Sequence, residues 1–127
     1  MLKWVVAAGF VLAMPAVAAA QDAANGKKLF TKCAPCHAIG AGAKNKVGPE
    51  LNGILERPAA SVEGFAYSDA LKKSGLKWDD ANLHKWLENP KALVPGTKML
   101  FPGVKDEVER DDIIAYIESF NADGTNK

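Results

Sequence analysis

Apolar residues recur at helical intervals near the C-terminal end of the chain. Five of them are assigned to one face of an amphipathic helix by this pattern, namely Val108, Ile113, Tyr116, Ile117 and Phe120. Asp106 followed by Glu109 has the form of a capping box, and acidic residues crowd the first turn, where the helix dipole favours them. The pattern therefore predicts a C-terminal helix that begins after Asp106.

Three shorter helices are predicted from residues that can cap a helix N-terminus. A side-chain oxygen at such a position accepts a hydrogen bond from a backbone N–H that has no partner inside the helix. The three helices run from Asp22 to about Ala34, from Ser68 to Ser74, and from Asp79 or Asp80 to about Asn89. Strand patterns are almost absent, so the predicted fold class is all-α.

The segment from 38 to 65 has no sustained period and is rich in Gly, Pro, Ala and Lys. A loop of this length counts against an ordinary protein core in a small domain, unless something other than protein fills the space. A few short helices around long loops also make a small apolar core, and domains of this size often depend on a metal or cofactor. The pattern therefore indicates a bound cofactor.

The first twenty residues have the layout of a secretory signal peptide. Lys3 gives a positive start, residues 4–13 form an apolar core, Pro15 breaks that core, and small residues lead up to Ala20. The alternative is an uncleaved anchor, but the stretch is alanine-rich and marginal against the roughly 20 apolar residues of a spanning helix. We therefore expect a cleaved signal peptide over 1–20, one domain over 21–127, and a periplasmic location.

The charges are balanced in number but not in position. The chain has 16 Lys or Arg and 15 Asp or Glu, for a formal net charge of +1. Residues 21–105 carry thirteen basic against eight acidic side chains, and residues 106–127 carry two against seven. Such a dipole can orient a charged partner. There is no basic run, so nucleic acid is a poor candidate for a partner.

Residues 33–37 read Cys-Ala-Pro-Cys-His, which is the C-x-x-C-H sequence of c-type haem attachment. The two thiols add across the vinyl groups of haem, and the adjacent histidine becomes the proximal iron ligand. A disulfide between Cys33 and Cys36 would close almost no loop and would stabilise the fold little. We therefore expect one haem c per chain, attached through Cys33 and Cys36, with His37 on the iron.

Two other chemistries share a C-x-x-C pair. A thioredoxin-like redox site needs a βαβ pattern around the pair, and none is visible in the sequence. A structural zinc site needs four ligands, and His84 is the only further His or Cys in the chain. Haem is therefore favoured over both.

Met99 is the candidate for the sixth iron ligand. It is the only methionine after residue 20 and lies in a turn-rich Pro-Gly-Thr-Lys-Met stretch, where a methionine is a poor core filler. A thioether suits iron, and His/Met ligation raises the reduction potential. His84 is the competitor, but its place within a predicted helix is more typical of a surface histidine. We therefore expect His37 and Met99 to be the metal ligands.

Four motifs together make the chain resemble the class I cytochromes c, and within them the bacterial c2 type. The motifs are C-x-x-C-H at 33–37, Gly-Pro-Glu-Leu-Asn-Gly at 48–53, Leu-Glu-Asn-Pro at 87–90, and Pro-Gly-Thr-Lys-Met at 95–99. The resemblance covers nearly all of the chain after residue 20. It implies the class I cytochrome c fold, three to five short helices wrapped around one covalently bound haem. It also implies one-electron transport in place of enzymatic catalysis.

The resemblance further implies the surroundings of the haem. The carbonyl of Pro49 would accept the Nδ1–H of His37 and fix the ring. Phe101 would cover the haem on the Met99 side. Four side chains would donate hydrogen bonds to the haem propionates, namely Arg57, Tyr67, Trp78 and Thr97.

Six lysines match positions that ring the exposed haem edge in this family, namely Lys27, Lys32, Lys46, Lys91, Lys98 and Lys105. Scattered lysines alone would indicate a solvated surface, but here the acidic residues gather in the last helix. The resemblance thus implies a positive face, sensitive to salt, on which acidic membrane redox partners dock. The implied partners of a monomer are a bc1-type reductase as donor and a photosynthetic reaction centre or terminal oxidase as acceptor.

Three positions depart from the family's usual pattern. Leu71 stands where Asn is common and Trp86 where Tyr is common, so a drier surrounding is expected on the Met99 side. Arg57 is followed by Pro58 in place of a polar residue.

Two other functions remain alternatives. A haem enzyme or gas-binding protein would need an easily vacated sixth site, and an obligate subunit of a larger complex would need a large, dry interface.

Overall fold

The structure is a computed structural model that describes residues 5, 7–9 and 21–127. The predicted signal peptide and its cleavage point after Ala20 lie mostly outside the described residues, so both remain predictions. Within the described residues, no helix has the length and apolar character needed to cross a membrane. Every residue predicted for the functional site lies within 21–127.

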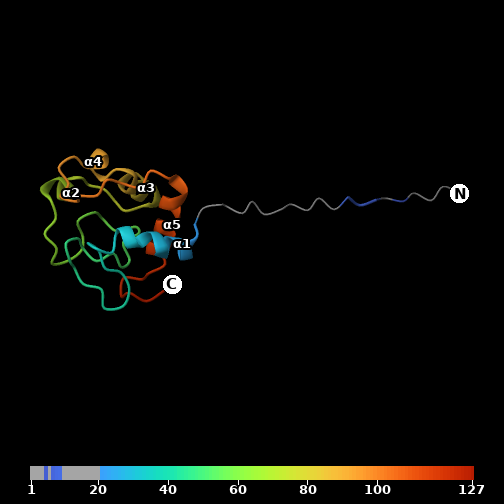
Figure 1. Cartoon of the computed structure of the whole chain (residues 1–127), viewed down its shortest axis with the longest axis horizontal. Coiled ribbons are helices and arrows are strands. Elements are labelled where there is room, and N and C mark those ends of the chain that lie inside the picture. The colour runs from blue at the N-terminus through green and yellow to red at the C-terminus, as the bar shows by residue number, and fades with distance from the viewer. Residues whose placement is uncertain (1–4, 6, 10–20) are drawn as a thin grey trace.

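Five α-helices and one 3-10 helix make up the helical structure of the described residues (Figure 1). In chain order they are α1 (Ala23–Leu29), the 3-10 helix η1 (Phe30–Lys32), α2 (Asp69–Lys73), α3 (Asp80–Glu88), α4 (Pro90–Leu93) and α5 (Glu107–Glu118). No strand forms within 21–127, where β contacts are limited to the isolated bridges Pro58–Lys77 and Phe120–Asn126. The predicted all-α fold class is confirmed, and the segment 38–65 is free of helix.

The side chains predicted to cap helices do so in the structure. Asp22, Ser68, Asp79 and Asp106 accept from the backbone N–H groups of Asn25, Leu71, Asn82 and Glu109, respectively. Each such cap contributes about 1 kcal/mol to helix stability. The capping box at the start of α5 is formed only in its Asp106 half, and Glu109 Oε2 instead lies 3.6 Å from Lys32 Nζ.

Two helix boundaries differ from the prediction. The sequence predicts a first helix to about residue 34, but α1 ends at Leu29 and the chain tightens into η1. The N–H groups of Cys33 and Ala34 both donate to the Phe30 carbonyl, at 2.8 and 2.9 Å, which closes this segment. Helix α4 begins at Pro90, just after the predicted end of the preceding helix at about Asn89, and the sequence predicts no helix there. Proline is tolerated at this place because the N–H of a first helical residue has no partner inside the helix.

Helices α1 and α5 pack closely against each other. A Cβ at Gly26 on α1 would overlap the carbonyl of Asp112 on α5, so glycine alone permits this approach. The rings of Phe30 and Tyr116 meet edge to face beside it, with centroids 5.3 Å apart and planes at 62°. The Asp112 carboxylate also accepts two hydrogen bonds, each 2.8 Å long, from the start of α1. This crossing joins the two ends of the described domain.

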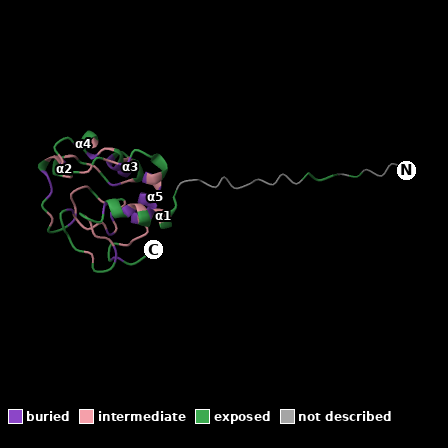
Figure 2. Cartoon of the chain, in the orientation of Figure 1, coloured by how far each residue is buried: buried purple, intermediate pink, exposed green. Residues whose placement is uncertain are grey.

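Many buried residues lie on α3 and α5, and others lie on the loops between the helices (Figure 2). Ile113 and Ile114 on α5 are 0% and 2% exposed. Val108, which the sequence pattern assigns to the same apolar face, is 45% exposed, so that assignment is wrong. At about 100° per residue, Val108 lies about 140° around the helix from Ile113, and the two cannot share a face.

Candidate functional site

The C-x-x-C-H motif is folded into a tight turn directly after η1. The N–H groups of Cys36 and His37 both donate to the Cys33 carbonyl, at 3.0 and 2.9 Å. The turn leaves Cys36 exposed, whereas Cys33 is only 9% exposed. Burial raises the pKa of the Cys33 thiol to about 11, so this thiol is protonated at neutral pH. Both cysteines are free thiols next to the histidine in sequence.

The His37 ring is held in one orientation by the backbone of Pro49. Its Nδ1 lies 2.7 Å from the Pro49 carbonyl oxygen, and because a carbonyl only accepts, Nδ1–H is the donor. This predicted contact is confirmed. Burial lowers the pKa of His37, so the ring is neutral at neutral pH. A neutral ring with its proton on Nδ1 keeps the Nε2 lone pair free for a metal.

Gly48 lets the second loop approach the histidine. A Cβ at Gly48 would overlap the His37 ring, so a larger residue would displace either the ring or the loop. The Gly48 N–H donates to the Cys36 carbonyl at 2.8 Å, and the Leu51 N–H donates to the Ala38 carbonyl at 3.0 Å. The sequence marks Gly48 only as part of a motif, and its contact with the ring becomes visible only in the fold.

Met99 lies on a braced turn between α4 and α5. The Thr97 N–H donates to the Val94 carbonyl at 3.1 Å, and Thr97 Oγ1 accepts from the Met99 N–H at 3.2 Å. Met99 and Phe101 are half-buried and pack against the buried core. Because Thr97 Oγ1 acts as an acceptor here, its own O–H remains available as a donor.

Arg57, Tyr67 and Trp78, predicted beside the haem propionates, form one group. The Trp78 N–H donates to the Arg57 carbonyl at 2.8 Å. Tyr67 and Trp78 are buried, and the Tyr67 hydroxyl oxygen accepts from the Val62 N–H at 2.9 Å. Burial raises the pKa of Tyr67, and the Val62 hydrogen bond and the Arg57 charge oppose this shift. Arg57 is therefore close enough to act on the Tyr67 hydroxyl.

Two of the departures from the family pattern are buried. Leu71 on α2 and Trp86 on α3 both belong to the apolar core. The rings of Trp86 and Trp78 meet edge to face, with centroids 5.2 Å apart and planes at 61°. The large ring at position 86 thus packs directly on a member of the group predicted beside the propionates.

His84, the alternative iron ligand, is engaged with another helix. Its Nε2 lies 2.5 Å from Asp111 Oδ1 on α5 and 3.9 Å from Asp80 Oδ2 on its own helix. The contact ties α3 to α5 and leaves the His84 side chain 19% exposed. No group of three or more His, Cys, Asp or Glu side chains suited to a metal is found among the described residues. The arrangement therefore favours Met99 over His84.

The six lysines predicted to form a docking face are all exposed. Lys46 Nζ donates to the carbonyl of Ala34, inside the C-x-x-C-H segment, at 2.8 Å. Lys32, which precedes the motif, pairs with Glu109, and Lys105 Nζ donates to the Glu88 carbonyl at 2.8 Å. Lys46 and Lys32 thus lie directly beside the motif.

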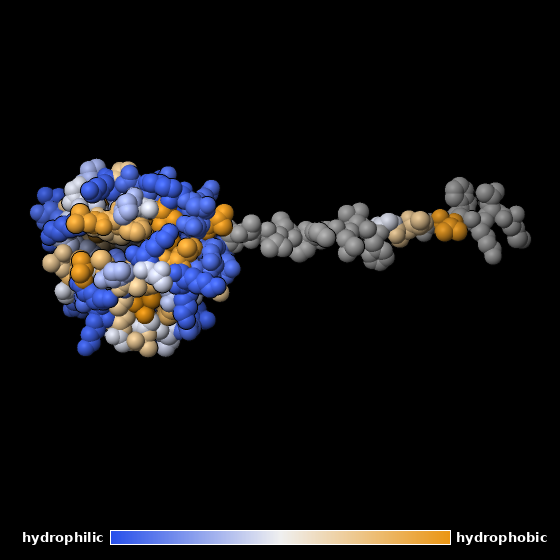
Figure 3. Space-filling view, viewed as in Figure 1, coloured by the Kyte–Doolittle hydropathy of each residue, from blue (hydrophilic) through white to orange (hydrophobic). Residues whose placement is uncertain are grey.

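Apolar side chains are exposed next to the loops that carry the site. Leu100, which follows Met99, is 88% exposed, and Val47, which precedes Gly48, is 78% exposed. Figure 3 shows apolar side chains in a band across the middle of one face. In the same orientation, Figure 1 shows α2, α3 and α4 above the level of this band and loops of the N-terminal half below it.

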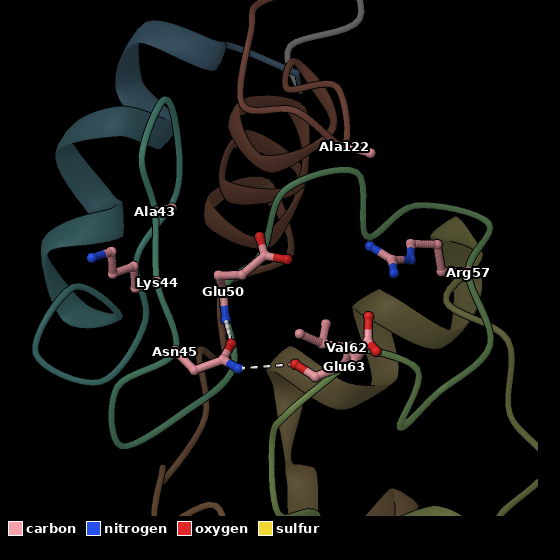
Figure 4. A pocket seen from close by; sticks show the side chains of 8 residues that line it. All are labelled: Ala43, Lys44, Asn45, Glu50, Arg57, Val62, Glu63 and Ala122. Atoms are coloured by element: carbon pink, nitrogen blue, oxygen red, sulfur yellow. Dashed lines mark hydrogen bonds between the residues drawn. The ribbon is translucent and has the colours of Figure 1, made fainter.

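A cavity of about 510 Å³ opens beside Arg57 (Figure 4). Its lining consists of Ala43, Lys44, Asn45, Glu50, Arg57, Val62, Glu63 and Ala122. Two of these side chains are cationic and two are anionic. Arg57 belongs to the group predicted beside the propionates, and Val62 donates to Tyr67 of that group, so the cavity adjoins the predicted propionate site.

The donor groups of these residues are of the kinds that hold a haem group. His37 offers a free Nε2, Met99 offers a thioether, and two free thiols accompany the histidine. Ser61 Oγ is buried and has no hydrogen-bond partner among the described residues. It directly precedes Val62, the partner of the Tyr67 hydroxyl. A buried hydroxyl requires a partner, and a haem carboxylate at this place would supply one.

Comparisons with known proteins find relatives that share most of the chain. Residues 23–121 match the family model described as cytochrome c. Cytochrome c2 of Blastochloris viridis is 57% identical over 119 residues, covering 93% of this chain and 94% of the relative. Cytochrome c2 of Rhodoblastus acidophilus is 56% identical over 106 residues, covering 84% of this chain and 99% of the relative.

A solved structure is similar in both sequence and fold. Cytochrome cH from Methylobacterium extorquens matches with a TM-score of 0.71 and 52% identity, covering 76% of this chain and 96% of that chain. The helices, the motif and the relatives agree. The chain therefore belongs to the cytochrome c family and has the class I fold of the c2 type.

Proposed function

We propose that the chain is a one-electron carrier with one haem c held between His37 and Met99. The observation that carries the proposal is the state of the His37 ring. Its Nδ1–H donates to Pro49, and burial keeps the ring neutral, so Nε2 is directed by the fold and free to bind iron. The haem iron, when bound, supplies one-electron chemistry between Fe(III) and Fe(II).

Attachment through both cysteines is the second part of the proposal. The Cys33 thiol is buried in the folded chain, whereas the Cys36 thiol is exposed. Two thioethers would fix the porphyrin next to His37, so the group could not be lost after export. Cys36→Ser is expected to leave at most one thioether and a poor yield of loaded protein. Efficient formation of two thioethers in this variant would contradict the attachment.

The proposal also assigns Met99 as the sixth ligand of the iron. The surroundings of Met99 are expected to be apolar and free of water. Phe101 is half-buried near Met99 in sequence, and Leu71 and Trp86 contribute apolar side chains to the core. Apolar surroundings and a thioether ligand both favour the reduced iron and raise the potential. A closed, six-coordinate iron suits a carrier more than an enzyme, which needs an open position for its substrate.

Docking of membrane redox complexes at the lysines is part of the same proposal. Lys32 directly precedes the C-x-x-C-H motif, and Lys98 directly precedes Met99. Lys46 lies two residues before Gly48. Leu100 and Val47 would add exposed apolar contact between the charged side chains. The resemblance suggests a bc1-type reductase as donor and a photosynthetic reaction centre or terminal oxidase as acceptor, met by a monomer in the periplasm.

Export and cleavage after Ala20 are part of the same proposal. The sequence layout supports them, with Lys3 at the start, an apolar core over 4–13 and small residues that lead up to Ala20. The mature chain would then begin at Gln21 in the periplasm.

The experiment that tests the carrier function is a reversible redox titration of the protein purified from the periplasm. A carrier is expected to titrate as a single one-electron couple, with the same curve in the oxidative and reductive directions. Carbon monoxide should leave the reduced spectrum unchanged, because Met99 occupies the sixth position. Rapid binding of carbon monoxide, or turnover of peroxide, would instead indicate a haem enzyme or gas-binding protein.

A further inference from the structure

The cavity beside Arg57 holds opposite charges next to the predicted propionate site. Figure 4 shows Glu50 and Arg57, from the same loop, on opposite sides of this cavity. No ion pair within 4 Å joins the two side chains in the described part of the chain. Both charges are thus available to act on other groups near the cavity.

The Glu50 carboxylate is fixed in place by the backbone. Its Oε2 accepts from the Asn52 N–H at 2.7 Å, and the Glu50 N–H donates to Asn45 Oδ1 at 2.9 Å. Asn45 in turn donates to the Glu63 carbonyl at 3.3 Å across the cavity. Glu50 is half-buried, whereas Glu63 is exposed. Glu50 therefore presents a localised negative charge that water screens only in part.

Arg57 meets the same short segment from the other side. Its Nη1 donates to the Asn52 carbonyl at 3.3 Å, so Asn52 contacts both charged side chains. Both charges also reach Tyr67. Burial is the main cause that raises the pKa of its hydroxyl, the Arg57 charge opposes the shift, and the Glu50 charge adds to it. The two side chains thus exert opposing fields at one predicted contact of the haem.

We propose that Glu50 sets the reduction potential of the haem by offsetting Arg57, and holds the potential below the value that Arg57 alone would give. The inference rests on the proposed haem carrier function. Oxidised iron carries one positive charge more than reduced iron. A fixed negative charge nearby therefore stabilises the oxidised state, and the fixed cation does the opposite. Glu50 would act on the haem through the electric field of its carboxylate, without binding the iron.

The test is the midpoint potential of Glu50→Gln at low ionic strength. Glutamine keeps an oxygen that can accept from the Asn52 N–H, so the loop is retained while the charge is lost. The potential is expected to rise, and to rise further in Glu50→Lys. Glu50→Asp keeps the charge and is expected to keep a potential close to that of the wild type.

Two glutamates provide matched controls for the loss of one negative charge. Glu63→Gln removes an exposed carboxylate from the same cavity. Glu56→Gln removes one that is 59% exposed and paired with Lys77 at 2.7 Å. Both are expected to raise the potential less than Glu50→Gln, because water and the ion-pair partner screen these charges.

The visible spectrum of each variant separates the two proposals. A variant with intact haem bands whose potential equals that of the wild type would overturn the role of Glu50 and leave the carrier function standing. Equal shifts in Glu50→Gln, Glu56→Gln and Glu63→Gln would also overturn it, because they would reflect net charge alone. A wild-type protein without covalent haem would refute the carrier function, and with it this inference.

Discussion

At the scale of single residues, the His37 ring is restrained from two directions. The Pro49 carbonyl fixes the Nδ1 side, and Gly48 leaves only enough room for the ring itself. A ligand restrained in this way loses little freedom when it binds a metal, and its basicity is set by the acceptor on Nδ1. The ring geometry therefore depends on one hydrogen bond and one missing side chain.

Gly48→Ala tests this restraint. The new Cβ would overlap the His37 ring, and overpacking of this kind costs about 1–3 kcal/mol. We expect a lower free energy of unfolding and altered haem bands, measured by denaturant titration and by absorption. Gly64→Ala is the control, because nothing lies within 4 Å of a Cβ there. It should cost only about 1 kcal/mol of backbone strain and leave the bands intact.

Met99→Ala tests the sixth ligand. Loss of the thioether is expected to leave the haem covalently attached, to open the iron to added ligands, and to lower the midpoint potential. His84→Ala is the matched control, since it removes the competing ligand. That variant should lose about 1 kcal/mol with its Asp111 contact and keep the wild-type spectrum and potential. The assignment is contradicted if Met99→Ala keeps the wild-type spectrum and potential while His84→Ala opens the iron to added ligands.

The sequence predicts those residues of the site whose chemistry is local or tied to a motif. Cys33, Cys36 and His37 are adjacent and need no fold to be recognised, and Pro49 follows from the family resemblance. The steric contact of Gly48, the buried hydroxyl of Ser61 and the shared contacts of Asn52 depend on loops that approach each other only in the fold. No spacing rule in the sequence indicates them.

At the scale of the elements, the crossing of α1 and α5 is the most extensive helix–helix contact of the described domain. Gly26 permits the approach, and Phe30 and Tyr116 fill the space beside it. Asp112 adds a polar contact at the same place, with Oδ1 on the Asp22 N–H and Oδ2 on Asn25 Nδ2. Asp112 thus ties the C-terminal helix to the residues at the start of the N-terminal helix.

Asp112 makes the stability of this crossing depend on pH. Hydrogen bonds from Asn25 and from the Asp22 N–H lower the pKa of Asp112. Its carboxylate therefore stabilises the folded state above the unfolded pKa of about 3.9, and this contribution is lost as the pH falls below that value. We expect Asp112→Asn to be less stable than the wild type at neutral pH. The difference should shrink in acid, as followed by thermal unfolding.

Equal losses at neutral pH and in acid would show that the Asp112 charge plays no part. Asp123→Asn is the control, because the pKa of Asp123 is also lowered but by a local contact with Thr125 in an exposed turn. That variant leaves the crossing untouched and removes only a contact in an exposed turn, so it is expected to lower the unfolding temperature less than Asp112→Asn at neutral pH.

The elements that the sequence predicts best are those with local signals. Asp22, Ser68, Asp79 and Asp106 cap their helices because a cap involves only four neighbouring residues. Helix α4 and the early end of α1 are missed because backbone contacts around Pro90 and the C-x-x-C-H turn decide them. Val108 is misassigned because five-residue spacing from Ile113 does not keep a helical face.

At the scale of the whole molecule, opposite charges are separated along the chain. Residues 106–127 carry seven acidic side chains against two basic ones, whereas residues 21–105 carry thirteen basic against eight acidic ones. Such a separation steers a partner toward one face during diffusion and adds little to affinity once contact is made. The steering would place the exposed Leu100 and Val47 against the partner.

Lys98→Glu tests this face through the rate of electron transfer to an anionic partner, such as an isolated bc1-type complex. The second-order rate constant is expected to fall several-fold at low salt, and the difference should diminish as salt is added. Lys73→Glu, the same charge change on α2 outside the predicted set, is the control and should have a smaller effect. Equal effects of the two substitutions would argue against a defined docking face.

The central claim is a six-coordinate haem iron held by His37 and Met99. It is tested most directly by the absorption spectrum of the purified protein, oxidised and then reduced and extended into the near infrared. We expect sharp low-spin bands on reduction, and in the oxidised protein the weak near-infrared band of iron–methionine ligation. A high-spin spectrum that shifts on addition of carbon monoxide would contradict the claim.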